Sequence, residues 1–346
     1  TCAQPLCREM LMSLNEQTLT AALQAVIDPN TGKDFVSSKA LKNLQIQGGD
    51  VSFDVVLGYP AKSQITDLRK ALIAAAKTVD GVNNVSANIT VDIVAHAAQR
   101  GVALLPQVKN IIAVASGKGG VGKSTTAANL ALALAAEGAK VGLLDADIYG
   151  PSQPMMMGIE GRPESSDGQT MDPLENYGVQ VMSIGFLVDQ DEAMIWRGPM
   201  ATQALEQLLR QTNWQSLDYL IIDMPPGTGD IQLTLSQRAP VTGAIIVTTP
   251  QTAAVSVALR GAAMFAKVGV PILGVAENMS FLEGADGSRQ YLFGQGGGLK
   301  VATALQTELL GEVPLDPAVR QGGDPDPGGR GHLAGRPDRS DCGQHD

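Results

Sequence analysis

The feature that most constrains this chain is a glycine-rich segment that follows an apolar stretch and precedes a helical one. It matches the pattern G-x-x-x-x-G-K-[ST] and reads Gly117-Lys118-Gly119-Gly120-Val121-Gly122-Lys123-Ser124. Glycines adopt backbone angles closed to other residues and let amide N–H groups approach phosphate oxygens. A helix that begins near Gly122 would point its positive end at those phosphates. The segment therefore predicts a loop that binds the phosphates of a nucleotide.

Side chains at the end of this loop are predicted to complete the phosphate site. Lys123 is expected to reach the β- and γ-phosphates of ATP, and Ser124 to place its hydroxyl on Mg²⁺. Thr125 continues the helix and is expected to touch the α-phosphate.

Short apolar stretches alternate with helical ones from Asn110 onward. The predicted strands are residues 111–115, 141–144, 219–222, 244–247 and 272–275. Strands separated by helices imply right-handed crossovers. We therefore predict an α/β fold, a mostly parallel, doubly wound P-loop NTPase sheet preceded by a small α+β domain. Ligands bind such sheets at the carboxyl ends of the strands, which is where the phosphate loop would lie.

Three aspartates are expected at this same edge of the sheet. Asp145 and Asp147 follow one apolar stretch, and Asp223 ends another. Asp223 is predicted to hold Mg²⁺ through a water, and Asp145 to lie near the ion in the same way. Asp147 is predicted to orient the attacking water, because phosphoryl transfer depends mainly on positioning and on charge compensation.

Two further features are predicted to belong to the nucleotide site. Gly227 and Gly229 would let the loop after Asp223 respond to the γ-phosphate. Asn278 follows the predicted strand 272–275, and its amide is a candidate for recognising adenine. A turn-forming asparagine explains that position equally well.

The chain is predicted to have five segments. The leader contains Met10 and Met12, either of which is an alternative start residue, and the Gly/Pro-rich end of the chain predicts a disordered or frameshifted tail. The segments are a disordered leader (1–12), a small α+β domain (13–93), a linker (94–109), the ATPase domain (110–323) and the tail (324–346).

Charge and hydropathy argue against several classes of protein. The net charge is −10, which disfavours binding to nucleic acid. The sequence has no apolar run of about 18 residues, so no membrane span is expected. It also shows no basic-then-apolar signal pattern at its start, and we expect a cytoplasmic location. Cys2, Cys7 and Cys342 lie near the two ends and suggest no disulfide framework.

The second residue of the loop, Lys118, adds a resemblance to a known class. An extra lysine at this position resembles the deviant P-loop of the ParA, MinD and nitrogenase iron-protein class. The resemblance implies a homodimer in which ATP lies between two subunits. It also implies a catalytic role for Lys118, which would reach the partner's nucleotide.

A wider set of motifs resembles the Mrp family of ATPases. The resemblance covers about residues 12–323, and residues 13–93 resemble the assembly-type domain of bacterial members. It implies an ATPase that carries iron–sulfur clusters, with apo iron–sulfur client proteins and assembly factors as partners. The matching segments are Gly117–Thr125, Asp145–Ser152, Trp196–Met200, Asp223–Asp230, Thr249–Gln251, Glu277–Ser280 and Phe293–Gly298.

The sequence departs from this family at the cluster site. Many members have C-x-x-C between the positions of Ser280 and Phe293, where two subunits bridge a [4Fe–4S] cluster. The interval here contains no cysteine, and clusters are held chiefly by thiolates. Glu283 and Asp286 offer hard oxygen atoms, which are poor substitutes. The cluster ligands therefore stay unknown.

Two other functions stay open, and the missing cysteines keep open the first of them. One is an ATP-gated scaffold or adaptor that holds partners without a cluster. The other is a positioning ATPase of the ParA or MinD type, which the acidic charge and the Gly/Pro-rich tail disfavour. Family members usually end in a helix that packs on the ATPase domain. Its replacement by this tail predicts lower stability and an exposed apolar patch.

Overall fold

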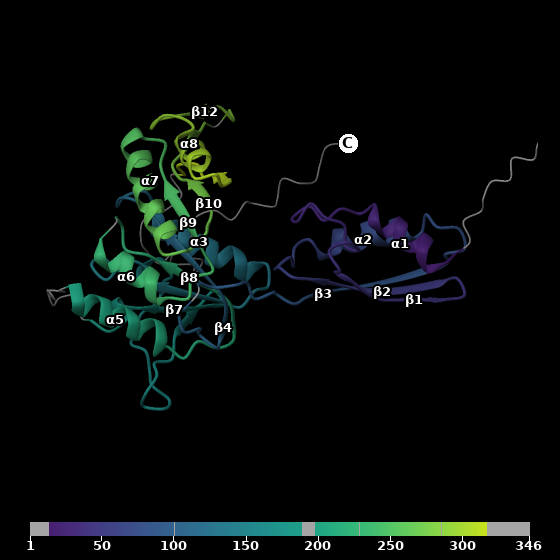
Figure 1. Cartoon of the computed structure of the whole chain (residues 1–346), viewed down its shortest axis with the longest axis horizontal. Coiled ribbons are helices and arrows are strands. Elements are labelled where there is room, and N and C mark those ends of the chain that lie inside the picture. The colour runs from purple at the N-terminus through teal and green to yellow at the C-terminus, as the bar shows by residue number, and fades with distance from the viewer. Residues whose placement is uncertain (1–13, 100, 189–197, 228, 285, 317–346) are drawn as a thin grey trace, which may run out of the picture. The chain divides into compact units, whose positions relative to one another are not determined.

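The computed structural model describes residues 14–99, 101–188, 198–227, 229–284 and 286–316 (Figure 1). The chain divides into two compact units, residues 1–94 and 95–346. Each unit has its own cluster of buried apolar side chains. The predicted leader and tail, the three cysteines, and Trp196 lie outside the described residues.

The first unit is a three-stranded sheet with two helices. β1 (Leu41–Gln47) pairs antiparallel with β2 (Asp50–Leu57), and β2 pairs parallel with β3 (Asn84–Val91). Alternate residues of β2 are buried, as expected for a sheet covered on one face. The helices α1 (Glu16–Gln24) and α2 (Ile65–Ala76) bury leucines in that core. These elements form the small α+β domain that the sequence predicted for this part of the chain.

The second unit is built on an eight-stranded sheet in the order β13-β10-β9-β4-β8-β5-β7-β6. All neighbouring strands are parallel except β6 and β7, which are antiparallel. The strands are β4 (Val108–Ala115), β5 (Val141–Asp145), β6 (Leu174–Asn176), β7 (Val179–Ser183), β8 (Leu217–Asp223), β9 (Gly243–Thr248), β10 (Ile272–Glu277) and β13 (Leu309–Glu312).

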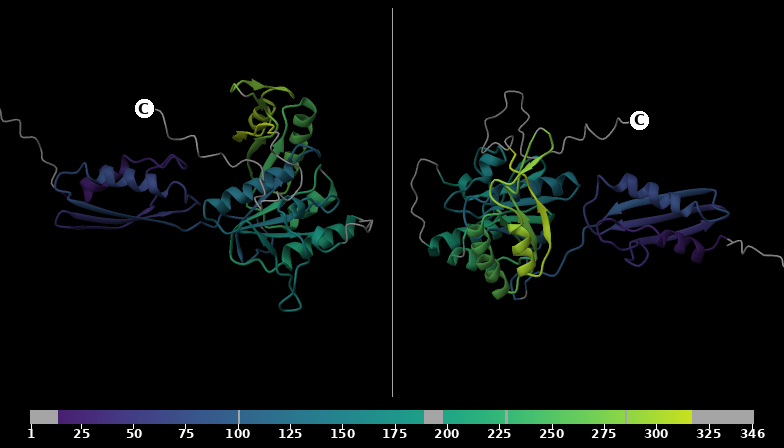
Figure 2. Two further views of the ribbon diagram at one scale, coloured as in Figure 1. Left: turned by 180° about the vertical axis from the view of Figure 1, so that it is seen from behind. Right: turned by 90° about the horizontal axis from the view of Figure 1, so that it is seen from above.

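Helices lie on both faces of this sheet (Figure 2). Every residue of β5 and of β9 is buried, as is usual for parallel strands covered on both sides. The helices are α3 (Lys123–Ala136), α4 (Gln153–Met156), α5 (Gly198–Arg210), α6 (Asp230–Arg238), α7 (Thr252–Lys267) and α8 (Gly297–Ala304). A short 3₁₀ helix spans Ile184–Phe186.

The structure confirms the predicted fold class and the five predicted strands of the large sheet. The periodicity did not indicate β6, β7 or β13, which lie at the two ends of the sheet. Near one of these ends, Leu273 and Leu310 are 42% and 49% exposed. They lie over Gly243 and Gly274, where an added Cβ would come within 2.5 Å of the respective leucine. These glycines leave room for the two leucines on the sheet surface.

Candidate nucleotide-binding site

The phosphate loop joins the central strand β4 to helix α3. Gly120 and Gly122 have φ angles of 77° and 80°, in the left-handed region that favours glycine. Gly117 is required for a different reason. A Cβ there would lie 2.2 Å from the main chain of Val257 on α7, so the loop approaches that helix more closely than any side chain allows.

The exposed part of the loop is suited to an anion. Gly119 and Gly120 are exposed, whereas Val121 and Lys123 are buried beneath them. α3 begins at Lys123, and the first N–H groups of a helix have no partners within the helix. Together with the helix dipole they attract phosphate groups. The backbone of this segment therefore has the form expected of a phosphate-binding loop.

Lys123 connects the loop to the aspartates at the sheet edge. Its side chain is only 6% exposed, and its ammonium forms an ion pair with Asp223. The same Nζ lies 3.2 Å from Ser124 Oγ and 4.0 Å from Asp147 Oδ2. The structure thus brings four predicted site residues into one cluster.

Asp145 and Asp223 end adjacent strands in matching register, which places their carboxylates close together. Asp145 is fully buried and accepts hydrogen bonds from the N–H groups of Ser152 and Gln153, each at 3.0 Å, and from Ser183 Oγ at 3.1 Å. Burial, aided by the charge of Asp223, raises the pKa of Asp145 to about 7.

Burial also raises the pKa of Asp147, while the positive charge of Lys123 acts in the opposite direction. Its side chain is 16% exposed, more than those of the other two aspartates. Asp147 is therefore the aspartate of this cluster that is most accessible to a water molecule.

Gln153 is a residue of this cluster that sequence reasoning missed. Its Nε2 donates to Asp223 Oδ2 at 2.8 Å and to the main-chain oxygen of Ser124 at 3.1 Å. A glutamine between Ser152 and Pro154 gives no local signal of such a role. The fold alone brings this side chain beneath the phosphate loop.

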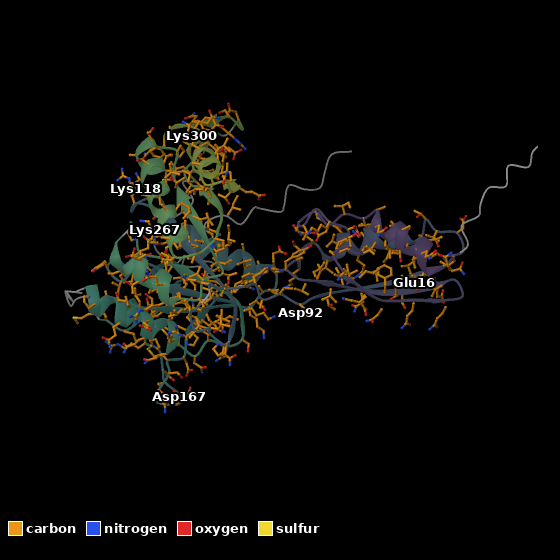
Figure 3. All side chains as sticks on the ribbon, viewed as in Figure 1. Glu16, Asp92, Lys118, Asp167, Lys267 and Lys300 are labelled. Atoms are coloured by element: carbon orange, nitrogen blue, oxygen red, sulfur yellow. The ribbon has the colours of Figure 1, made fainter. Side chains whose placement is uncertain are left out.

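Asn278 and Lys118 contact other residues of their own chain. Asn278 Nδ2 donates to the main-chain oxygen of Val121 at 2.9 Å, which places the amide directly against the phosphate loop. Lys118 is labelled in Figure 3. Its Nζ donates to Gln251 Oε1 at 3.3 Å, at the start of α7.

A short hairpin occupies the interval where the resemblance implied a C-x-x-C. β11 (Leu282–Glu283) pairs antiparallel with β12 (Arg289–Gln290). The guanidinium of Arg289 stacks over the ring of Phe281 at 4.2 Å, and Tyr291 meets that ring edge-on. Within the described residues, no group of three or more His, Cys, Asp or Glu side chains could hold a metal ion.

Comparison with known proteins decides the family. The family model described as "NUBPL iron-transfer P-loop NTPase" matches residues 107–332, which is more than half of the chain. The chain belongs to this family. A second model, described as "Iron-sulfur cluster assembly protein", matches residues 16–89. These matches confirm the resemblance drawn from the sequence.

Curated relatives of this NUBPL-type NTPase match along most of its length. One from Synechocystis sp. is 47% identical over 321 residues and covers 90% of each chain. One from Escherichia coli (strain K12) is 48% identical over 295 residues, covering 85% of this chain and 80% of the relative. Both are named iron–sulfur cluster carrier protein.

A solved structure resembles the NTPase unit. It is a nucleotide-binding protein from Archaeoglobus fulgidus in complex with ADP, 40% identical with a TM-score of 0.53. The match covers 61% of this chain and 84% of that one. Nucleotide binding and hydrolysis are the general activity of such P-loop NTPases. In the parts of this chain that the structure describes, the helices are too short or too polar to cross a membrane.

Proposed function

We propose that this chain is a Mg²⁺-dependent ATPase that acts as a homodimer and carries iron–sulfur clusters to apoproteins. The observation that carries the ATPase assignment is the buried contact between Lys123 and Asp223 beneath a phosphate-binding loop. The names of the curated relatives support the assignment of iron–sulfur clusters as the cargo. The cytoplasmic location stays a prediction.

The side chains next to the loop fit a magnesium ion. Mg²⁺ prefers hard oxygen ligands and keeps several of its waters. Ser124 supplies a hydroxyl and Asp223 a carboxylate, and both contact Lys123 Nζ. We propose that these two residues hold the ion, partly through water, with Asp145 nearby. The bound ion would neutralise charge on the β- and γ-phosphates.

Lys123 and Asp147 would act directly on the phosphoryl group. Lys123 would exchange its contact with Asp223 for the β- and γ-phosphate oxygens. Asp147 would orient a water whose oxygen attacks the γ-phosphorus, while the bond from that phosphorus to the bridging oxygen breaks. ADP leaves with the bonding electron pair, and the water protons pass to the phosphate and to solvent.

Lys118 would complete the site across a dimer. Among the described residues, its ammonium donates a hydrogen bond to the neutral amide of Gln251. A neutral amide is a weaker partner for an ammonium than a phosphate group is. We propose that Lys118 leaves Gln251 and contacts the nucleotide of the partner subunit. Hydrolysis would then change the dimer interface and release cargo or a client.

Two measurements test the proposal. The first is ATP hydrolysis by Lys123→Ala, which should fall to background because both the phosphate contact and the partner of Asp223 are lost. Lys267→Ala removes an exposed lysine at the end of α7 (labelled in Figure 3) and should hydrolyse ATP normally. Full activity of Lys123→Ala would contradict the assignment.

The second measurement is anaerobic reconstitution with iron and sulfide, followed by iron counting with and without ATP. One four-iron cluster shared by a dimer corresponds to about two irons per subunit. Variants of Cys2, Cys7 and Cys342 would then identify the thiolates, because the sequence has no other cysteine. Absence of bound iron, with ATPase activity intact, would contradict the carrier function.

One observation favours a second candidate, an ATP-gated adaptor without a cluster. The β11–β12 hairpin carries no cysteine and is braced by the contact between Arg289 and Phe281. A surface of this kind can hold a protein partner without any metal. The adaptor would bind its clients in an ATP-dependent way in the absence of iron, whereas the carrier would need reconstitution first.

A further inference from the structure

The amide of Gln153 lies inside the acidic cluster, although glutamine has no role in the hydrolysis described above. The residue is 0% exposed and begins α4. Its side chain reaches Asp223 and the main chain of Ser124, and its own main-chain N–H donates to Asp145 at 3.0 Å. One residue therefore contacts both carboxylates of the proposed metal site and the phosphate loop.

The two oxygens of Asp223 have different partners. Oδ1 is paired with Lys123, and Oδ2 accepts from Gln153 Nε2 at 2.8 Å. If Lys123 turns to the phosphates, Oδ1 loses its partner while Oδ2 keeps one. The hydrogen bond from Gln153 would then hold the buried carboxylate of Asp223 in its present orientation.

The other polar atom of the same amide has no partner among the described residues. Gln153 Oε1 is buried and accepts no hydrogen bond within the described part of the chain. Buried polar atoms in native proteins are nearly always satisfied, so an exception points to an unseen donor. Water bound to a divalent cation is a strong donor, and Gln153 contacts the residues proposed to hold that cation.

We propose that Gln153 is a positioning residue, which keeps Asp223 oriented for the divalent cation after Lys123 has moved to the nucleotide. This inference rests on the proposed Mg²⁺-dependent ATPase function. It predicts a defect in binding of the metal to the nucleotide complex, with little effect on the nucleotide alone.

The test replaces Gln153 with methionine, which has nearly the same length and shape but no hydrogen-bonding amide. Mn²⁺, a paramagnetic substitute for Mg²⁺, is titrated into the ADP complex and followed by electron paramagnetic resonance. The Mn²⁺ dissociation constant should rise roughly ten-fold, as expected for the loss of a hydrogen bond to a charged group. ADP affinity without metal should stay within about two-fold of the original.

Gln180→Met is the matched control. Gln180 lies on β7, where it accepts from the main-chain N–H of Gln215 at 3.0 Å, outside the site. This variant should bind Mn²⁺ like the original chain. If Gln153→Met does not fold, Gln153→Asn keeps the polar group but is too short to reach Asp223, and it should show the same loss of Mn²⁺ affinity.

The outcomes separate this inference from the proposed function. Unchanged Mn²⁺ affinity in Gln153→Met, with normal ADP binding, overturns the positioning role. Equal losses of ADP affinity with and without metal also overturn it, since they indicate a purely structural residue. If the unmodified chain binds ADP without any metal dependence, the Mg²⁺-dependent function itself fails.

Discussion

Gly117→Ala is a stringent test of the phosphate loop, because one methyl group would meet main-chain atoms of helix α7. The added Cβ would lie 2.2 Å from the carbonyl carbon and oxygen of Val257 and 2.6 Å from the nitrogen of Ala258. Ordinary contact begins at 3.4 Å. Loop and helix must therefore separate by about 1.2 Å, because main-chain atoms cannot rotate away as a flexible side chain can.

The expected effects follow from that displacement. Overpacking of this kind costs about 3 kcal/mol, the upper part of the usual range. For a unit of this size that corresponds to a fall of roughly 6–12 °C in the melting temperature. A shift of about 1 Å in a phosphate loop should also lower the ATPase rate by about 100-fold. Thermal unfolding without nucleotide, followed by circular dichroism, measures the first effect, and phosphate release measures the second.

Gly119→Ala is the matched control in the same loop. Its φ is outside the left-handed region, and an added Cβ would meet nothing within 4 Å. The melting temperature of the nucleotide-free protein should therefore change by less than about 3 °C. If Gly117→Ala melts as the original chain does, the close approach to α7 cannot be the reason for a glycine at this position.

Three further predictions concern the other charged and polar contacts. Without metal or nucleotide, the free energy of unfolding should fall as pH rises from about 4 to about 7, because the native state favours protonated Asp145. In urea titrations of Asp145→Asn, this fall should be smaller by roughly 2–4 kcal/mol. A variant with the same pH profile as the original chain would refute the prediction. At protein concentrations that favour dimers, Lys118→Ala should slow ATP hydrolysis by about a thousand-fold, while its affinity for ADP stays unchanged. A normal rate would exclude a role of Lys118 at the partner's nucleotide. Tyr59→Phe should destabilise the first unit by about 1–2 kcal/mol, because the Tyr59 hydroxyl donates a hydrogen bond to the buried Asp28 at 2.7 Å. An unaltered midpoint of denaturant unfolding would count against this reason.

Local sequence was sufficient to predict the central part of the sheet and most of the site. The five apolar stretches have the length and flanking residues of buried parallel strands, and Gly117–Ser124 carries its own pattern. Asp145 and Asp223 could be predicted to meet because the carboxyl ends of parallel strands lie at one edge. The observed register places them opposite each other.

The remaining parts depended on tertiary contacts that no local pattern encodes. β13 is four residues long with alternating burial, too short for a periodicity argument. Gln153 reaches Asp223 across seventy positions of sequence, so its role depends on the fold rather than on its neighbours. The contact of Lys118 with Gln251 likewise joins distant segments. The roles assigned to the site residues all stay predictions, those of Lys123, Ser124 and Asp223 included.

The positions of the cysteines in the sequence determine which parts of such a protein oxidants of thiols can modify. Residues 14–316 contain none, so the nucleotide site has no thiol that peroxide could convert to sulfenic acid. An oxidant that destroys an iron–sulfur cluster would therefore find no cysteine to modify around Lys123. Oxidation of cysteine would therefore act on the two ends of the sequence, where Cys2, Cys7 and Cys342 lie, and not on the nucleotide site.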